Sequence, residues 1–203
     1  MREEEKNSLL NLANILSLLR ILLIPVFLVL LVQGKIVGAS AVFFLAGFTD
    51  VLDGAAARLL NQKTKIGALL DPAADKLLMT SAFIVLTIPS LNSPHIIPLW
   101  LTIAVISRDL FIVSSAFALY KLRGQKTFPP SLFGKSSTVC QFMVLVLVLF
   151  LNSFQISFPY LRLLYFLTLA LTLLSGVHYS YIGFRIISAP RKSKIMHKEN
   201  SYD

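Results

Sequence analysis

Charge and cysteine are the two things that this sequence has little of. Only 14% of its 203 residues are charged, whereas 56% are hydrophobic, and the mean hydropathy is +0.74. These values exclude an ordinary soluble protein and indicate an all-α integral membrane protein of one domain's length. The single cysteine, Cys140, excludes an internal disulfide, and we expect it to be a small apolar side chain in a membrane helix.

Acidic residues are also scarce, with 10 Asp and Glu against 19 Lys and Arg, so the formal net charge is +9. Such an excess could indicate nucleic-acid binding, but the basic residues lie mainly at expected helix ends and in the C-terminal tail. That distribution fits anionic lipid better, and we expect no nucleic-acid partner. The N-terminus, M-R-E-E-E-K-N, is too acidic for the basic leader of a secretory signal, so we expect no cleavage.

Apolar segments near the roughly 20 residues that cross a bilayer predict six transmembrane helices. They cover residues 14–32, 36–60, 67–88, 98–120, 136–151 and 159–187. We expect residues 1–13 to form a cytoplasmic segment with a short interfacial helix, residues 14–187 the six-helix transmembrane domain, and residues 188–203 a basic cytoplasmic tail.

Loop charges predict the orientation in a bacterial-type cell membrane. The connectors after the second and fourth segments and the C-terminal tail are rich in Lys and Arg, and Lys121 to Lys135 is expected to be the longest hydrophilic loop. The connectors after the third and fifth segments have no Lys or Arg, and the connector after the first has only Lys35. Because basic loops stay in the cytoplasm, we expect both termini there, with the acidic cluster described next opening to the same side.

Four carboxylates are concentrated between Asp50 and Asp75, in apolar surroundings. Asp50 and Asp53 are three residues apart near the end of the second segment, and Asp71 and Asp75 are four apart near the start of the third, so each pair shares a helix face. A charge at the centre of a membrane helix costs at least about 2.5 to 3.5 kcal/mol, so intramembrane carboxylates indicate function. If the two helices pack antiparallel, all four carboxylates converge.

Such a cluster would repel itself unless cations were bound. Two divalent ions would cancel the charge, and an all-oxygen site without His or Cys suits Mg²⁺, Mn²⁺ or Ca²⁺ better than zinc. Two alternatives stay open from the residues alone. The small residues beside the acids are also typical of ordinary membrane-helix packing, and intramembrane acids are also found on the ion pathway of a transporter or channel.

Written as fixed positions, the stretch reads Asp50-x2-Asp53-Gly54-x2-Ala57-Arg58-x8-Gly67-x3-Asp71-x3-Asp75. This pattern resembles the complete signature of the CDP-alcohol phosphatidyltransferases. Members of that family transfer a phosphatidyl group from CDP-diacylglycerol to an alcohol and release CMP. The resemblance therefore implies a membrane-embedded transferase of phospholipid biosynthesis with that family's fold, and a homodimer.

The resemblance also implies roles for the motif residues. It implies that Asp75 is the general base and that two Mg²⁺ or Mn²⁺ ions are held by Asp50, Asp53, Asp71 and Asp75. It implies that the CDP moiety is surrounded by Asp53, Gly54, Ala57, Arg58 and Gly67.

Four further polar residues are candidates for binding the acceptor or a phosphate: Asn14, Arg20, Arg108 and Lys135. The stretch N-I-L-S-L-L-R-I-L-L-I-P-V-F-L, which holds the first two, is similar to the opening helix of the family's phosphatidylglycerophosphate synthases. The alternative for Arg20 is a side chain that extends to the lipid headgroups, and Lys76 either caps the acidic cluster or extends likewise.

Arg108 and Asp109 are neighbours in sequence in the fourth segment. Side chains of neighbours point about 100° apart on a helix, so we do not expect the two to form one close pair. An interhelical ion pair is one interpretation. The other places the forked guanidinium of Arg108 on a phosphate.

Two short stretches bear on which alcohol is the acceptor. Ser107-Arg108-Asp109 stands where phosphatidylglycerophosphate synthases more often have Arg-Glu, and Ser137 stands where a second lysine is expected. Both departures resemble the CMP-forming cardiolipin synthases, whose acceptor, phosphatidylglycerol, lacks a dianionic phosphate. We favour glycerol 3-phosphate, with phosphatidylglycerol as the alternative and a membrane cation transporter as a remote one.

Overall fold

The computed structural model describes residues 12–59, 67–89, 94–123 and 131–188, with side chains for 18–49, 73–89, 94–119, 121, 131–186 and 188. These residues form six helices, so the predicted all-α architecture is confirmed. The helices are α2 (Leu12–Val32), α3 (Ile36–Leu59), α4 (Gly67–Leu86), α5 (Leu99–Arg123), α6 (Leu132–Phe154) and α7 (Leu161–Ser188).

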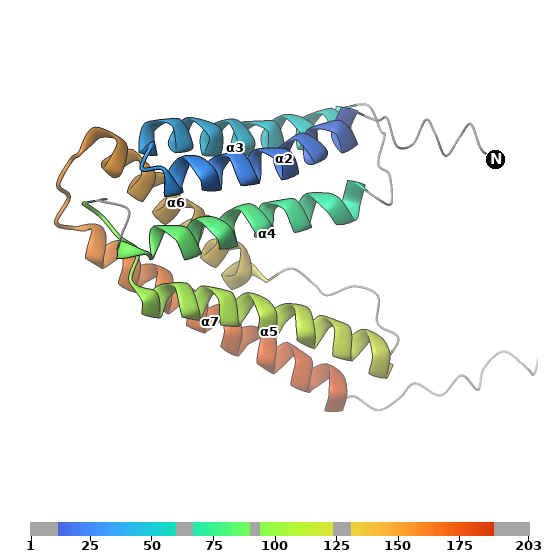
Figure 1. Cartoon of the computed structure of the whole chain (residues 1–203). Helices are drawn as coiled ribbons and strands as arrows, with labels where there is room; N and C mark the ends of the chain where they lie inside the picture. The colour runs from blue at the N-terminus through green and yellow to red at the C-terminus, as the bar shows by residue number, and fades with distance from the viewer. Residues whose placement is uncertain (1–11, 60–66, 90–93, 124–130, 189–203) are drawn as a thin grey trace, which may run out of the picture.

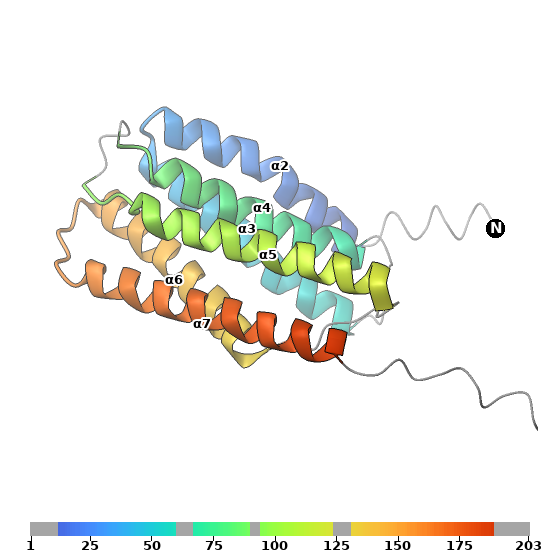
Figure 2. The same ribbon diagram turned by 90° about the horizontal axis from the view of Figure 1, so that it is seen from below.

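The helices run up and down along one long bundle (Figures 1 and 2). The main neighbours of α2 are α3 and α4, while α7 packs along both α5 and α6, and α3 and α6 join the two groups. The start of α2, the end of α3 and the start of α4 lie at the same end of the bundle, on the right in Figure 1. The predicted acidic motif is divided between two of these three helix ends.

The outer surface of the bundle is apolar. Large hydrophobic side chains such as Val113, Phe117 and Leu163 are each more than two-thirds exposed. Among the described residues, the helices Leu99–Leu119, Leu132–Phe154 and Leu161–Ile186 are long and apolar enough to cross a membrane, and shorter apolar stretches cover Leu18–Val32 and Ile36–Thr49. A surface of this kind is stable in lipid rather than water. The chain is therefore a multi-pass membrane protein.

An aromatic cluster lies where α3 meets its neighbours. Phe43 is fully buried and packs against Phe27 of α2, with ring centroids 5.5 Å apart, and stacks on Phe142 of α6 at 5.8 Å. Ala39 and Ala46, one turn either side of Phe43, are also fully buried. Small residues beside a large ring let the helix backbones approach closely, as is usual between membrane helices.

The start of α6 differs from the prediction. The helix begins at Leu132 rather than at Ser136, because Ser131 caps it: the Ser131 Oγ accepts a hydrogen bond from the Gly134 N–H at 2.9 Å. Together with the extension of α5 to Arg123, this shortens the loop predicted between Lys121 and Lys135. Lys135 consequently lies in the first turn of α6, where it is exposed.

At the opposite end of the bundle, uncharged hydrogen bonds fix the connector between α4 and α5. The backbone N–H of His95 donates to Asn152 Oδ1 at 2.9 Å, and Asn152 Nδ2 donates to the His95 carbonyl at 2.8 Å. The hydroxyl of Tyr165 donates to the Ile96 carbonyl at 3.2 Å. The connector is thereby attached to both α6 and α7.

Candidate functional site

The backbone places the motif at one end of the bundle. Asp50 and Asp53 lie in the second half of α3, and Asp71 and Asp75 lie in the first half of α4. Both helix ends are at the same end of the bundle (Figure 1). Side chains of the remaining motif residues lie outside the described set, so the convergence of the four carboxylates and the CDP contacts stay predictions. This applies to Asp50, Asp53, Gly54, Ala57, Arg58, Gly67 and Asp71, and also to Asn14 at the start of α2.

Asp75 is the motif acid whose side chain is described, and it forms an ion pair with Arg20. The Arg20 Nη1 donates to Asp75 Oδ1 at 2.5 Å, which links α2 to α4. The Arg20 side chain is 0% exposed, so the interpretation that it extends to the headgroups is wrong, whereas the Asp75 side chain is 43% exposed. A buried guanidinium thus stands beside a carboxylate that remains accessible to a ligand.

Lys76, the next residue on α4, pairs in a different direction. Its Nζ donates to Asp109 Oδ2 at 2.7 Å, which links α4 to α5. Lys76 therefore contacts a carboxylate of a neighbouring helix, although 42% of its side chain stays exposed. Asp75 and Lys76 together connect α4 to the helices on either side of it.

Arg108 and Asp109 do form a close pair, so the expectation that they would not was wrong. The Arg108 Nη1 donates to Asp109 Oδ1 at 2.7 Å, because the long arginine side chain bends across the angle between neighbouring positions. The interhelical pair that we considered as one interpretation is also present, since the other oxygen of Asp109 accepts from Lys76. The Asp109 carboxylate thus pairs with both Lys76 and Arg108.

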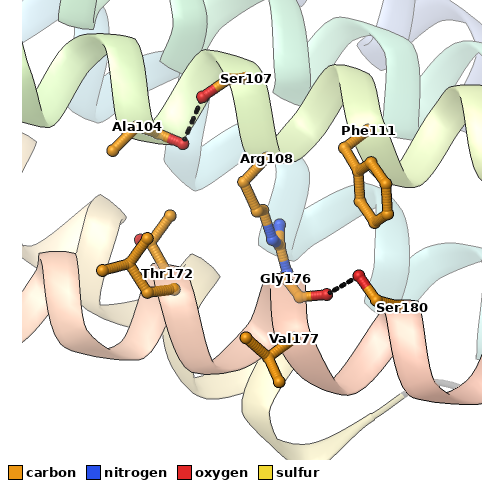
Figure 3. A pocket seen from close by; sticks show the side chains of 9 residues that line it. Ala104, Ser107, Arg108, Phe111, Thr172, Gly176, Val177 and Ser180 are labelled. Carbon is orange, nitrogen blue, oxygen red and sulfur yellow. Dashed lines mark hydrogen bonds between the residues drawn. The ribbon is translucent and has the colours of Figure 1, made fainter.

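The guanidinium of Arg108 reaches from α5 to α7, and Figure 3 shows it pointing toward that helix. Its Nε and Nη2 donate to Ser175 Oγ at 3.1 and 2.6 Å, and Nη2 also approaches the Gly134 carbonyl of α6 at 3.5 Å. Its central carbon lies 5.9 Å from the centre of the Tyr179 ring. Arg108 is consequently held by three helices.

A pocket of about 450 Å³ opens between α5 and α7 beside this guanidinium. Its lining is mostly apolar, with hydroxyls at both sides and Arg108 as the charged member (Figure 3). It is lined by Ala104, Ser107, Arg108, Phe111, Thr172, Leu173, Gly176, Val177 and Ser180. Such a lining suits a ligand that is partly polar and partly hydrocarbon.

Lys135 and Ser137 lie on different sides of α6. Lys135 is exposed, whereas Ser137 is fully buried against α7. The Ser137 Oγ is 3.2 Å from Thr172 Oγ1 and accepts a hydrogen bond from Gln141 Nε2 at 3.1 Å. Ser137, which stands where a second lysine was expected, therefore makes an uncharged polar contact between α6 and α7.

Sequence reasoning left some partners of the charged residues unidentified. The adjacency of Lys76 to Asp75 drew attention to Lys76, but nothing in the sequence indicated that Asp109 would be its partner. Ser175 and Tyr179 gave no signal at all, because their contact with Arg108 depends on which helices pack together. These partners became visible only in the tertiary structure.

Of the four acids predicted to bind metal, Asp75 is the one whose side chain is described. No group of three His, Cys, Asp or Glu that could hold an ion occurs among the described side chains, since the other three motif acids lie outside them. Asp75, the described member, offers an accessible carboxylate, which is a ligand that Mg²⁺ and Mn²⁺ accept. The donor chemistry fits a hard divalent cation, and the site itself stays a prediction.

An apolar bundle with charged side chains paired inside it defines a membrane protein with an intramembrane polar site. Residues 10–175 match the family model of the CDP-alcohol phosphatidyltransferases. The chain belongs to this family of enzymes, which act in phospholipid synthesis and are generally metal-dependent, and the prediction made from the motif is confirmed.

Individual relatives divide between two activities. The CDP-diacylglycerol–glycerol-3-phosphate 3-phosphatidyltransferase of Aquifex aeolicus is 31% identical over 180 residues, which cover 88% of this chain and 98% of that protein. The CMP-forming cardiolipin synthase of Rattus norvegicus is 43% identical over 105 residues, which cover 51% of this chain and 33% of that protein. Mycobacterium tuberculosis relatives named after cardiolipin synthase are 34% identical over 134 residues, and this chain spans 61% of their length.

Proposed function

We propose that this protein transfers the phosphatidyl group of CDP-diacylglycerol to sn-glycerol 3-phosphate, which gives phosphatidylglycerophosphate and CMP. The observation that carries the proposal is the ion pair between Arg20 and Asp75, which puts a buried cation of the opening helix beside the last acid of the motif. The similarity to the Aquifex aeolicus enzyme over 98% of its length supports this choice of acceptor.

The proposed chemistry is a single displacement. Asp75 accepts the proton of the acceptor hydroxyl while that oxygen attacks the lipid-bearing phosphorus, and the bond from this phosphorus to CMP breaks. The motif holds no Ser, Cys or His that could act as a covalent nucleophile. Arg20 orients the Asp75 carboxylate and supplies positive charge where phosphate oxygens would lie.

The other motif residues complete the proposed site. Two Mg²⁺ or Mn²⁺ ions would neutralise the diphosphate charge when they are bound by Asp50, Asp53, Asp71 and Asp75. The CDP moiety would be contacted by Asp53, Gly54, Ala57, Arg58 and Gly67. The acceptor would be contacted by Asn14, Arg20, Arg108 and Lys135. We further propose six membrane spans, both termini and the site on the cytoplasmic side, and a homodimer.

A second candidate is CMP-forming cardiolipin synthesis, with phosphatidylglycerol as the acceptor. Two observations favour it. Ser137 lies in a neutral contact where a second cation was expected, and Asp109 neutralises charge on Arg108. Both reduce the positive charge available for a dianionic phosphate. The partly apolar pocket beside Arg108 would also suit a lipid acceptor better than a small soluble one.

Purified protein supplied with CDP-diacylglycerol and Mg²⁺ distinguishes these candidates. Glycerol 3-phosphate and phosphatidylglycerol are offered in separate reactions, CMP release is measured, and the lipid product is identified by mass spectrometry. We expect phosphatidylglycerophosphate from the first reaction and little product from the second. Cardiolipin from the second alone would replace the proposal by its alternative.

A cation transporter is the remaining alternative. It would require acids along a path through several helices, whereas the motif acids are confined to α3 and α4. Divalent-cation flux in protein-containing liposomes, with no CMP release from CDP-diacylglycerol, would favour the transporter. We expect the reverse result.

A further inference from the structure

The α4 helix is held by ion pairs from two sides. Asp75 pairs with Arg20 of α2, and the next residue, Lys76, pairs with Asp109 of α5. Consecutive residues on a helix point about 100° apart. The two ion pairs therefore act in different directions, and together they oppose rotation of α4 about its own axis.

Asp109 is itself fixed. Its side chain is 16% exposed, and each of its carboxylate oxygens accepts from a different cation at 2.7 Å. One of those cations, Arg108, is 8% exposed and is bound in turn to Ser175 of α7. Asp109 thus connects α4 to a part of the bundle that is already anchored.

We propose that Asp109 is a positioning residue for the reaction, because it holds Lys76 and thereby aims the segment of α4 that carries Asp75. This inference rests on the proposed function, in which Asp75 is the general base. Asp109 is not assigned a contact with substrate. It acts by keeping α4 in one rotation and by keeping the ammonium of Lys76 directed toward α5.

Loss of the Asp109 carboxylate has a specific consequence. Lys76 has a long flexible side chain that is already 42% exposed, so without its partner it can turn toward the neighbouring acid. An ammonium that competes for Asp75 would disturb both its pairing with Arg20 and its role as base. The damage should therefore depend on Lys76, and this dependence distinguishes positioning from general destabilisation.

A matched control exists between the same parts of the chain. The hydroxyls of Thr87, just after α4, and Thr102 of α5 are 2.6 Å apart, near the other end of the two helices. Thr102 is 4% exposed. Thr102→Val removes this partly buried contact without altering any charge, so it reports the effect of losing a polar contact alone.

The experiment measures kcat, KM for CDP-diacylglycerol and thermal unfolding in detergent. It compares wild type with Asp109→Asn, Asp109→Glu, Lys76→Met, the Lys76→Met/Asp109→Asn double variant and Thr102→Val. We expect Asp109→Asn to lower kcat by about tenfold to a hundredfold, as misplacement of a reacting group does, with KM changed by less than about threefold. Asp109→Glu should recover most of the kcat. The double variant should have a kcat no lower than that of Asp109→Asn, and Thr102→Val should lower the unfolding temperature only.

Several results would overturn the assignment. Asp109→Asn with unchanged kcat would do so. A loss of kcat equal to that of Thr102→Val would also do so. So would losses of kcat in Lys76→Met and Asp109→Asn that multiply in the double variant. A wild-type protein that releases no CMP would refute the proposed function and this assignment with it. An active wild type with an equally active Asp109→Asn variant would refute only the positioning role.

Discussion

At the scale of single residues, a buried arginine is the clearest sign that this bundle is built around a site. Arg20 is fully enclosed although it lies in an apolar helix, and its guanidinium is 2.5 Å from a carboxylate that is still accessible. Burying a charge is costly unless it is paired, and packing alone never requires such a pair. We therefore expect Arg20 to act through its charge beside Asp75.

Arg20→Gln should abolish most activity. The substitution leaves Asp75 without the described guanidinium partner and removes positive charge from the proposed phosphate site, so we expect CMP release to fall by about a hundredfold or more. Arg20→Lys should lose less activity, because it keeps the positive charge. It should still lose some, because lysine lacks the forked geometry of the guanidinium. The matched control is Arg162→Gln, an exposed arginine on α7, which should retain full activity. Equal activity of Arg20→Gln and wild type would contradict the role of Arg20.

Asp75→Asn should remove the proton acceptor while keeping the size of the side chain. We expect no measurable CMP release, whereas the variant should still elute as folded protein and unfold cooperatively on heating. An amide can still accept a hydrogen bond from Arg20, so the fold should tolerate the change. Substantial activity of this variant would show that the general base lies elsewhere.

At the scale of helices, the sequence predicted most of what the structure shows. All six apolar segments are helices, and five of the six begin within two residues of their predicted start, because hydrophobic length determines where a membrane helix can lie. The start of α6 was missed, since Ser131 lies in a polar stretch where a cap and a loop look alike. Partners such as Ser175 depend on helix packing, which spacing along one chain does not encode.

The contact between the start of α6 and α7 makes a prediction at this scale. A Cβ added at Gly134 would lie 2.9 Å from the Tyr179 hydroxyl oxygen and 3.0 Å from the Ser131 Oγ. Gly134→Ala should therefore displace the Tyr179 and Ser131 side chains and lower the unfolding temperature by about 2 to 4 °C, the shift expected for roughly 1 kcal/mol. Gly176→Ala is the matched control, because nothing lies within 4 Å of its added Cβ. Equal stability of the two variants would contradict the close approach.

At the scale of the whole molecule, the described ion pairs lie apart from the hydrogen-bonded connector between α4 and α5. The described ion pairs lie on α2, α4 and α5, while the other end of the bundle is fixed by the hydrogen bonds of Asn152 and Tyr165 to the connector before α5. The two ends provide well-separated positions for testing the orientation that the loop charges predict.

Cysteine labelling tests the proposed orientation. Cys140 is buried, so the parent protein should react little with a membrane-impermeant thiol reagent. Lys121→Cys, exposed near the end of α5, should react only when the cytoplasmic face is accessible, as in inverted vesicles. Tyr160→Cys, where the native side chain is 69% exposed just before α7, should react only in intact cells or right-side-out vesicles. The opposite pattern would invert the proposed topology.

The uncharged attachment of the connector before α5 has a consequence for how the protein responds to ionic strength. Dissolved ions screen partly exposed pairs such as Lys76 and Asp109, but they have little effect on the amide hydrogen bonds between His95 and Asn152. Concentrated salt should therefore loosen one end of the bundle while the other stays closed. The bundle would then open at the end that holds the ion pairs and stay closed at the connector before α5.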